Sequence, residues 1–361
     1  MTEKDFILKK PNTLNINSGS FTWQSPSNIA LVKYWGKIEP QIPKNTSISL
    51  TLNNCHTTTT LEFSKKEKTS IGFNVEVIFE GKIKEDFKPK ILKFFKRIQK
   101  YVPFITEYDY IIKTENSFPH SSGIASSASG MSALALCLMS IEKDLNPKIS
   151  NEYFTQKASF LARLGSGSAA RSIEGEIVVW GQHNEIPNSS NHYGIKFPFK
   201  IHENFKNYQN TILLVDKGEK QVSSTVGHNL MVNHPYANQR FEQANENNSK
   251  LSEILQTGDL NAFVNLVESE ALTLHAMMMT SNPYFILIKP NTLKIIEKIW
   301  AYRKENNSNI CFTLDAGANV HVLFPDREKE TINTFITNEL IAFCQNNHYI
   351  CDNVGLGARQ L

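Results

Sequence analysis

Apolar residues along the chain follow two spacings, and each spacing predicts a different element. Residues 73–79 carry an apolar side chain at every second position before Gly81, which predicts one arm of a hairpin. Residues 90–101 place their apolar side chains along one side of a helix. Further strands are predicted at 47–52, 110–113, 177–180, 211–215, 309–314 and 320–324. Further helices are predicted at 131–141, 151–164, 236–256, 258–276, 291–305 and 328–346.

The order of these elements predicts an α+β fold rather than a doubly wound α/β sheet, because strands and helices mix without a regular βαβ rhythm. A chain of 361 residues is long enough for two packed domains. We expect a loose N-terminal arm at 1–20, an N-terminal domain at 21–205 and a C-terminal domain at 206–361. The junction falls in a loop-like stretch, 183–208, that is rich in Asn and His.

The charge balance gives no overall attraction to nucleic acid or to an anionic membrane. Lys and Arg number 38 against 35 Asp and Glu, so the net charge is +3. The basic helix at 90–101 has two interpretations, a nucleic-acid surface or a solvated face, and the nearly neutral chain favours the second. An anionic ligand must therefore be held by a local cluster of cations.

Cysteine usage and the lack of targeting patterns predict a cytoplasmic protein. The cysteines are dispersed and form no CxxC pair, which fits reduced thiols better than disulfides or a zinc site. No secretory signal is visible at the N-terminus, and no apolar run reaches membrane-spanning length. We therefore expect no membrane partner. The five cysteines are Cys55, Cys137, Cys311, Cys344 and Cys351.

A Ser/Gly-rich loop at 119–130, PHSSGIASSASG, stands between a predicted strand and a predicted helix. Its small residues let the backbone bring N–H groups close to a ligand, and the helix start adds free N–H groups and a positive dipole end. These features suit a polyphosphate, while the alternative is that the serines only cap the helix. The chain contains neither GxxxxGK[ST] nor GxGxxG, so neither a P-loop nor a dinucleotide-binding fold is indicated.

The loop resembles the ATP-binding loop of the GHMP small-molecule kinase superfamily. Within that superfamily, residues 28–37, NIALVKYWGK, resemble the segment that distinguishes the diphosphomevalonate decarboxylase family. Three further segments fit that family in the same order, and 222–225, VSST, is a weaker match. The three segments are 45–52, NTSISLTL, 165–172, GSGSAARS, and 315–319, DAGAN. The last segment usually carries Pro where this chain has Ala318, and this loss would loosen the turn without removing chemistry.

The resemblance implies a two-lobed GHMP kinase fold, with a ribosomal protein S5 domain 2-like N-terminal domain and a ferredoxin-like C-terminal domain. It implies ATP-dependent decarboxylation of mevalonate 5-diphosphate to isopentenyl diphosphate, CO2, ADP and phosphate, a step of isoprenoid biosynthesis in the mevalonate pathway. ATP and Mg²⁺ would take part, and a homodimer is expected. Three alternatives stay open: a mevalonate 5-phosphate decarboxylase, a mevalonate 3-kinase, and a non-catalytic nucleotide-binding homologue.

The resemblance assigns the phosphoryl-transfer chemistry to Asp315 and Lys33. Asp315 would orient the 3-hydroxyl of the substrate and accept its proton. Lys33 would balance charge on the transferring phosphoryl group. Without the resemblance, Asp315 could equally be a turn aspartate and Lys33 a surface lysine. His275 has no second metal ligand at a known spacing, so packing is expected there.

A multiply anionic substrate needs a cationic pocket, and the resemblance implies that residues of the segments 28–37, 165–172 and 222–225 form it. Arg171 would bind the substrate carboxylate, and Tyr34 with Lys37 would bind the diphosphate. A surface salt bridge is the alternative for Arg171. Further substrate contacts are expected from Ser166, Ser168 and Ser224. Expected ATP contacts are Ser121, Ser122, Gly123, Ala125, Ser126, Ser127 and Ser129. Ser127 is also the candidate Mg²⁺ ligand, with helix capping as its alternative.

Overall fold

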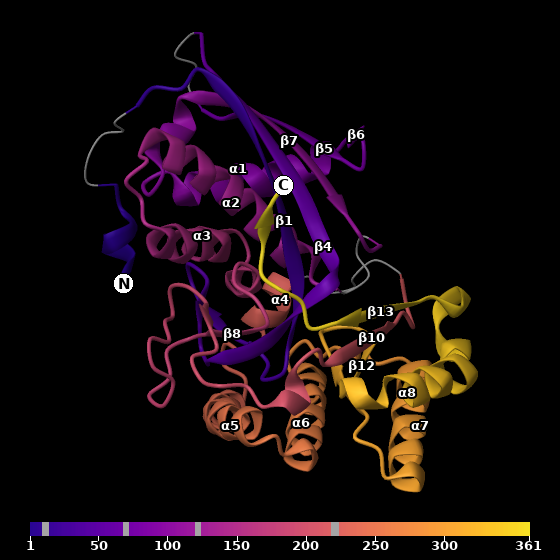
Figure 1. The fold of residues 1–361 in the computed structure, drawn as a ribbon. Coiled ribbons are helices and arrows are strands. Elements are labelled where there is room, and N and C mark those ends of the chain that lie inside the picture. Colours follow the sequence, from indigo (N-terminus) through magenta and orange to yellow (C-terminus); the bar gives the residue numbers. More distant parts are fainter. Residues whose placement is uncertain (9–13, 68–71, 120–123, 218–223) are drawn as a thin grey trace.

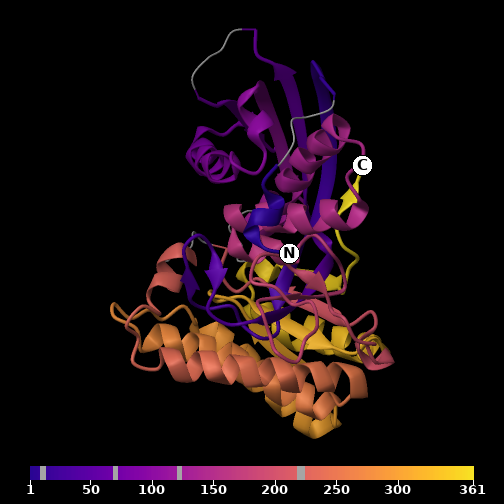
Figure 2. The same cartoon turned by 90° about the vertical axis from the view of Figure 1, so that its left-hand side faces the viewer.

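The computed structural model describes residues 1–8, 14–67, 72–119, 124–217 and 224–361. Two lobes stack on each other, an upper lobe built on one large sheet and a lower lobe with long helices (Figures 1 and 2). Strands and helices mix in both lobes, which confirms the α+β class. The proposed boundary at 205/206 stays a prediction.

The sheet of the upper lobe is built around two long antiparallel strands, β1 and β4. Its order is β14–β1–β4–β7–β5–β6, and β8 joins the N-terminal end of β4 and pairs with β9. β5 turns at Gly81 into β6, which confirms the hairpin predicted from the alternation at 73–79. The strands are β1 Ser18–Ala30, β4 Ser47–Lys65, β5 Asn74–Phe79, β6 Lys82–Ile83, β7 Tyr108–Asn116, β8 Ile177–Trp180, β9 Ile195–Lys196 and β14 Arg359–Gln360, and the separate hairpin is β2 Lys37–Ile38 with β3 Ile42–Pro43.

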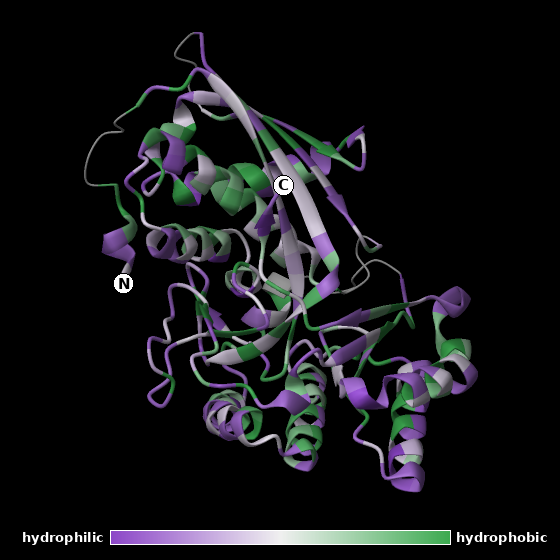
Figure 3. Ribbon diagram, in the orientation of Figure 1, coloured by the Kyte–Doolittle hydropathy of each residue, from purple (hydrophilic) through white to green (hydrophobic). Residues whose placement is uncertain are grey.

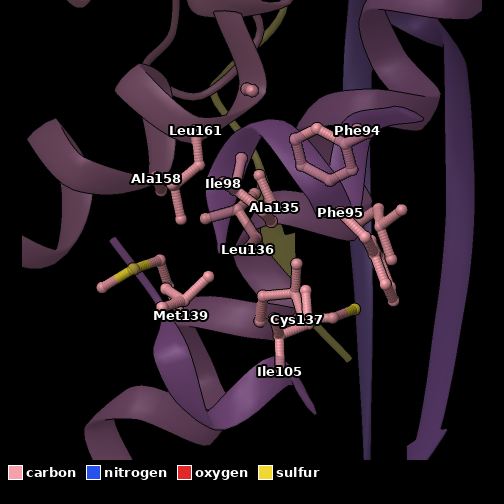
Figure 4. Packing of buried hydrophobic residues seen from close by; sticks show 14 of the residues in the cluster. Phe94, Phe95, Ile98, Ile105, Ala135, Leu136, Cys137, Met139, Ala158 and Leu161 are labelled. Carbon is pink, nitrogen blue, oxygen red and sulfur yellow. The ribbon is translucent and has the colours of Figure 1, made fainter. Parts of the chain in front are cut away.

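Three helices cover one face of this sheet: α1 (Lys88–Ile98), α2 (Ser126–Leu145) and α3 (Asn151–Gly165). α2 lies between the sheet and α3, whereas α1 packs on α3 and on β5. α2 is rich in small and apolar residues that allow close packing (Figure 4). α1 buries Phe94 and Phe95 and exposes its lysines, which confirms the amphipathic helix predicted at 90–101.

Hydropathy divides the upper lobe as this packing requires (Figure 3). α2 is strongly hydrophobic, whereas β1 and β4 are intermediate because threonine and serine fill many of their positions. No helix in the described part of the chain combines the length and hydropathy needed to cross a bilayer. All five cysteines are unpaired.

The lower lobe contains a four-stranded antiparallel sheet in the order β11–β12–β10–β13. On one face of this sheet, Phe312 and Val322 pack with α7 and α8. On the other face, Cys311 and Leu323 join a hydrophobic cluster that includes residues of β1, β4, α5 and α6. The lobes therefore share one hydrophobic cluster. The elements are β10 Gln209–Leu213, α4 Ser224–Asn229, α5 Ala237–Thr257, α6 Leu260–Met279, α7 Pro290–Asn306, β11 Cys311–Leu314, β12 Val320–Phe324, α8 Lys329–Phe335 and β13 Tyr349–Asn353.

The helix predicted at 328–346 is shorter than expected. Regular α-helical bonding ends at Phe335, and a π turn at Ile336–Leu340 and a 3-10 turn at Ile341–Phe343 follow. Ile336 and Leu340 are still fully buried. Apolar residues thus continue at helical spacing beyond Phe335, so the sequence pattern could not show where the regular helix ends.

The chain returns to the upper lobe after β13. β14 pairs with β1 at Trp23 and Gln24. On the way, the backbone of Gly357 passes so close to Gly175 that a Cβ on Gly175 would lie 1.9 Å from the Gly357 nitrogen. Only glycine fits at position 175 with this backbone path.

The N-terminal arm is anchored by one aromatic residue, which its polar composition did not indicate. Phe6 is fully buried and stacks on Phe160 with ring centroids 4.6 Å apart. β1 then begins at Ser18, inside the stretch predicted as the arm.

We predict that Phe6→Ala lowers the free energy of unfolding by about 3–5 kcal/mol, because it removes a fully buried ring and leaves a cavity. Urea denaturation followed by circular dichroism measures this change. Ile7→Ala is the matched control: Ile7 is 39% exposed, and its truncation should cost less than about 0.5 kcal/mol. Equal stability of the two variants would contradict the anchoring role.

Candidate active site

The two residues assigned to catalysis meet where the lobes face each other. Lys33 lies just after β1 and Asp315 just after β11, and the Lys33 Nζ is 3.3 Å from Asp315 Oδ1. The Lys33 side chain is 2% exposed and that of Asp315 is 34% exposed, so the ammonium is enclosed while the carboxylate reaches an opening. The alternative of a surface lysine is therefore wrong.

The backbone around Lys33 is held by a buried carboxylate from α6. Glu270 accepts a hydrogen bond from the Lys33 N–H at 2.9 Å and a bidentate pair from Arg240. The Lys33 Nζ also donates to the Ala30 carbonyl at 2.6 Å. Burial lowers the pKa of Lys33, and the charge of Asp315 opposes this shift. Neither Glu270 nor Arg240 stands in a motif, so sequence reasoning missed both.

The turn that carries Asp315 is fixed from two helices. The Asp315 carbonyl accepts from the Gly317 N–H at 2.7 Å and from the His275 Nε2–H at 3.1 Å. Thr292 of α7 donates to the Ala318 carbonyl at 2.6 Å, so a side chain restrains the turn at the position where a looser turn was expected. His275 is 1% exposed, in line with the packing role expected for it.

Arg171 is a buried cation with neutral partners. It ends a 3-10 turn at Gly167–Arg171 and is 3% exposed. Its guanidinium donates to Asn28 Oδ1 at 3.2 Å and to Ser47 Oγ at 2.5 Å, and it lies 5.7 Å from the Trp180 ring centroid. Burial lowers the pKa of Arg171 to about 10, and the charge of Asp315 opposes the shift.

No ion pair of Arg171 is formed within the described residues, so the surface salt bridge considered for it is wrong. A buried guanidinium without a counter-ion favours an anionic ligand. Sequence reasoning did not name its partners Asn28 and Ser47, although both stand inside the two matched segments at 28–37 and 45–52.

Tyr34 and Arg171 both contact Trp180, and the Tyr34 and Trp180 ring centroids are 4.7 Å apart. Its hydroxyl is buried and has no hydrogen-bond partner among the described residues, and burial raises its pKa. Gly167 is required here, because a Cβ at this position would lie 2.8 Å from the Tyr34 hydroxyl. Lys37 is nearly buried, and its ammonium contacts Gln41 at 2.9 Å and Glu39 at 3.2 Å.

The start of α2, the proposed phosphate-binding loop, meets the turn that leads to Arg171 through two serines, Ser127 and Ser166. Ser126 and Ser127 form the first turn of α2, after Ala125 in the left-handed conformation with φ of 47°. The Ser127 and Ser166 hydroxyls are 3.3 Å apart. Ser129 instead points inward, since it is fully buried and bonds to Thr57 at 2.6 Å.

Several predicted contacts have no described side chain. Ser121, Ser122 and Gly123 lie outside the described residues, and the side chain of Ser224 is not described either, although it begins α4. Ser168 is partly buried, and its carbonyl accepts from the Asn28 amide at 3.2 Å.

A cavity of about 230 Å³ lies between the start of α2 and the sheet. Ser126, Ser127 and Gly130 line it together with apolar residues that include Phe79 and Phe87. A larger hollow of about 750 Å³ lies against residues 188–193, and no predicted site residue lines it. In the described part of the chain, no group of three or more His, Cys, Asp or Glu side chains could hold a metal ion.

An acid, a buried amine and a guanidinium between two lobes, next to the start of α2, are the arrangement expected of an ATP-using enzyme of the GHMP kinase class. Two family models match the chain: the diphosphomevalonate decarboxylase-like N-terminal domain over residues 25–192 and the mevalonate 5-diphosphate decarboxylase C-terminal domain over residues 211–354. The chain belongs to the diphosphomevalonate decarboxylase family, as the sequence segments predicted.

Relatives support this assignment along most of the chain. The diphosphomevalonate decarboxylase of Ganoderma lucidum is 29% identical and aligns with 87% of this chain and 81% of its own length. The enzyme of the same name from Bos taurus is 26% identical over 87% of this chain and 78% of its own.

Solved structures of the family confirm the fold. Mevalonate diphosphate decarboxylase from Staphylococcus aureus matches with a TM-score of 0.80 at 25% identity, over 95% of this chain and 98% of that chain. A structure in complex with MVAPP, AMPPCP and magnesium matches with a TM-score of 0.80 at 26% identity, over 95% of this chain and 99% of that chain. The predicted two-lobed GHMP kinase fold is therefore confirmed.

We predict that Arg171→Ala raises the KM for the anionic substrate about 10- to 100-fold while changing the KM for ATP much less, because it removes charged hydrogen bonds worth about 1.5–3 kcal/mol. Steady-state kinetics with each substrate varied in turn measures the two constants. Arg359→Ala, at the exposed end of β14, is the control and should change neither constant. An equal loss of affinity for both substrates would point to a structural role for Arg171.

Proposed function

We propose that this chain carries out the reaction of its family, in which mevalonate 5-diphosphate and ATP yield isopentenyl diphosphate, CO2, ADP and phosphate. The observation that supports it most is the Lys33–Asp315 contact at 3.3 Å beside the buried guanidinium of Arg171. In this proposal, the base Asp315, the cation Lys33 and the carboxylate-binding Arg171 surround the substrate. A non-catalytic homologue would have no need to keep the carboxylate and the ammonium together.

The proposed reaction has two stages. Asp315 orients the 3-hydroxyl and accepts its proton while the hydroxyl oxygen attacks the γ-phosphorus of ATP and ADP leaves. The C3–O bond of the phosphorylated intermediate then breaks and its electron pair leaves with phosphate. The C1–C2 bond electrons form the C2–C3 double bond as CO2 is released. Lys33 stabilises the transferred phosphoryl group and the departing phosphate.

Arg171 is proposed to hold the substrate carboxylate from a buried position. Its neutral partners Asn28 and Ser47 fix the guanidinium plane without competing for its charge. Tyr34, Lys37, Ser166, Ser168 and Ser224 are proposed to bind the rest of the substrate.

ATP is proposed to lie with its phosphates at the start of α2, where Ser126 and Ser127 present free N–H groups and hydroxyls. The neighbouring cavity of about 230 Å³, with its apolar walls, is proposed to take the adenosine part. Mg²⁺ would be held mainly by the phosphates and water, since it binds readily through substrate phosphates and few protein ligands. Ser127 is the proposed protein ligand.

A homodimer, a cytoplasmic location and the absence of a nucleic-acid partner remain predictions. Light scattering of the purified protein measures the molar mass and tests the dimer. Salt-dependent binding to DNA or RNA would contradict the interpretation of α1 as a solvated helix.

A product assay separates the candidate activities. The protein is incubated with Mg-ATP and either mevalonate 5-diphosphate or mevalonate 5-phosphate, and the products are identified by mass spectrometry together with CO2 release. Isopentenyl diphosphate and CO2 from the diphosphate support the proposal. Faster turnover of the monophosphate, or a 3-phosphorylated product without CO2, would replace it with one of the sister activities.

We predict that Asp315→Asn lowers kcat about 10²- to 10⁴-fold, because an amide cannot accept the hydroxyl proton. ATP affinity should stay close to that of the unchanged protein, since the proposed cradle lies on the other lobe. Single-turnover kinetics and equilibrium nucleotide binding measure the two quantities. Asp326→Asn, on a surface turn of the same lobe, is the control. A near-normal rate in Asp315→Asn would remove this carboxylate from the mechanism.

A further inference from the structure

One histidine from the lower lobe contacts three successive residues of the segment that follows β1. The Gly36 N–H donates to His228 Nδ1 at 3.0 Å. The His228 ring lies 4.2 Å from the Tyr34 ring and 4.9 Å from the Trp35 ring, measured between centroids. The preceding Gly227 allows this approach, since a Cβ on it would lie 2.4 Å from the Trp35 ring. No motif in the sequence pointed to His228.

The Gly36 contact fixes the tautomer of the His228 ring. A backbone N–H can only donate, so Nδ1 must offer its lone pair and the proton must sit on Nε2. The ring stays neutral, because burial together with the positive charges of Lys37 and Arg171 lowers the pKa of His228 to about 3. His228 is therefore a fixed neutral donor that is 8% exposed.

Donors without acceptors gather around this ring. Among the described residues, the bond from Gly36 is the only hydrogen bond of the His228 ring, which leaves its Nε2–H for a ligand or solvent. The Tyr34 hydroxyl, whose ring contacts that of His228, is buried and has no hydrogen-bond partner among those residues. Arg171, which like Tyr34 contacts the Trp180 ring, bonds only to neutral groups. A buried hydroxyl left unpaired is costly, and a buried guanidinium without a counter-ion attracts negative charge, so these groups favour an occupant rich in anionic acceptor oxygens.

We propose that His228 is a further substrate-binding residue, which donates from Nε2–H to the diphosphate of the substrate beside Tyr34 and Lys37. The inference rests on the proposed function and adds a specific ligand contact to it. A neutral donor attracts phosphate oxygen without adding another buried charge to the cations already present. The same side chain holds Gly36 through Nδ1, so it also positions the backbone between Tyr34 and Lys37.

Three substitutions distinguish the role of Nδ1, which accepts from Gly36, from the proposed role of Nε2–H, which donates to the substrate. His228→Asn can keep an acceptor near the Nδ1 position for Gly36 but removes the distal donor. His228→Gln can place an amide N–H near the Nε2 position but removes the acceptor for Gly36. His228→Leu removes both. Asn229→Ala, at the exposed neighbouring position of α4, is the control.

For His228→Asn, we expect the KM for mevalonate 5-diphosphate to rise about tenfold, as for loss of one hydrogen bond to a charged group, with kcat and the KM for ATP nearly unchanged. His228→Gln should retain most of the substrate affinity and lose thermal stability. His228→Leu should show both defects, and Asn229→Ala neither. An unchanged substrate KM in His228→Asn overturns the proposal, and so does a parallel loss of stability, kcat and ATP affinity in all three variants.

Direct binding of inorganic pyrophosphate keeps this test separate from the test of the reaction. Trp35 and Trp180 flank the site, so their fluorescence reports binding, and excess Mg-ADP is added to occupy the nucleotide cradle. Weaker pyrophosphate binding to His228→Asn than to the unchanged protein supports the inference even if mevalonate 5-diphosphate is not turned over. Equal affinities overturn it even if the reaction is confirmed.

Discussion

Burial of cationic side chains at the junction of the lobes is the constraint on which the rest of the site depends. Each buried ion carries a desolvation cost of several kcal/mol unless charge and hydrogen bonds compensate it. Lys33 is compensated by Asp315, and the charges of Arg240 and Glu270 behind it compensate each other. Arg171 is compensated only by an amide, a hydroxyl and an aromatic face. The excess of positive charge is thus built into the fold, and an anionic substrate would remove it.

The two lobes divide the proposed chemistry between them. The helix-start cradle and the turn that ends at Arg171 both belong to the upper lobe, where the Ser127 and Ser166 hydroxyls are 3.3 Å apart. The proposed base, Asp315, comes from the lower lobe on a turn held by His275 and Thr292. Phosphoryl transfer depends mainly on alignment, so a shared hydrophobic cluster between the lobes serves the reaction directly.

The sequence revealed the segments that carry the site residues more clearly than the residues that hold those segments in place. Lys33, Arg171 and Asp315 stand in matched segments, and the structure brings them together. Glu270 and His228 could not be found in this way, because a carboxylate in a helical pattern or a histidine after a serine-rich stretch has no spacing that marks it. Elements were predicted well where apolar spacing was strict, as at 73–79. β1 escaped prediction because only Phe21 and Trp23 mark an apolar side in its first half, before Pro26. β13 and β14 escaped because their partners lie far away in the sequence.

The return of the chain to the upper lobe has a consequence for the order of folding. Arg359 bonds to Gln24 across 335 positions of sequence, and β14 supplies the edge strand beside β1. During synthesis, the upper lobe emerges first but must wait for the whole lower lobe before this edge of its sheet is covered. The pairing of β14 with Trp23 and Gln24 can therefore form only after both lobes have been synthesised, and until then this part of β1 is an open strand edge.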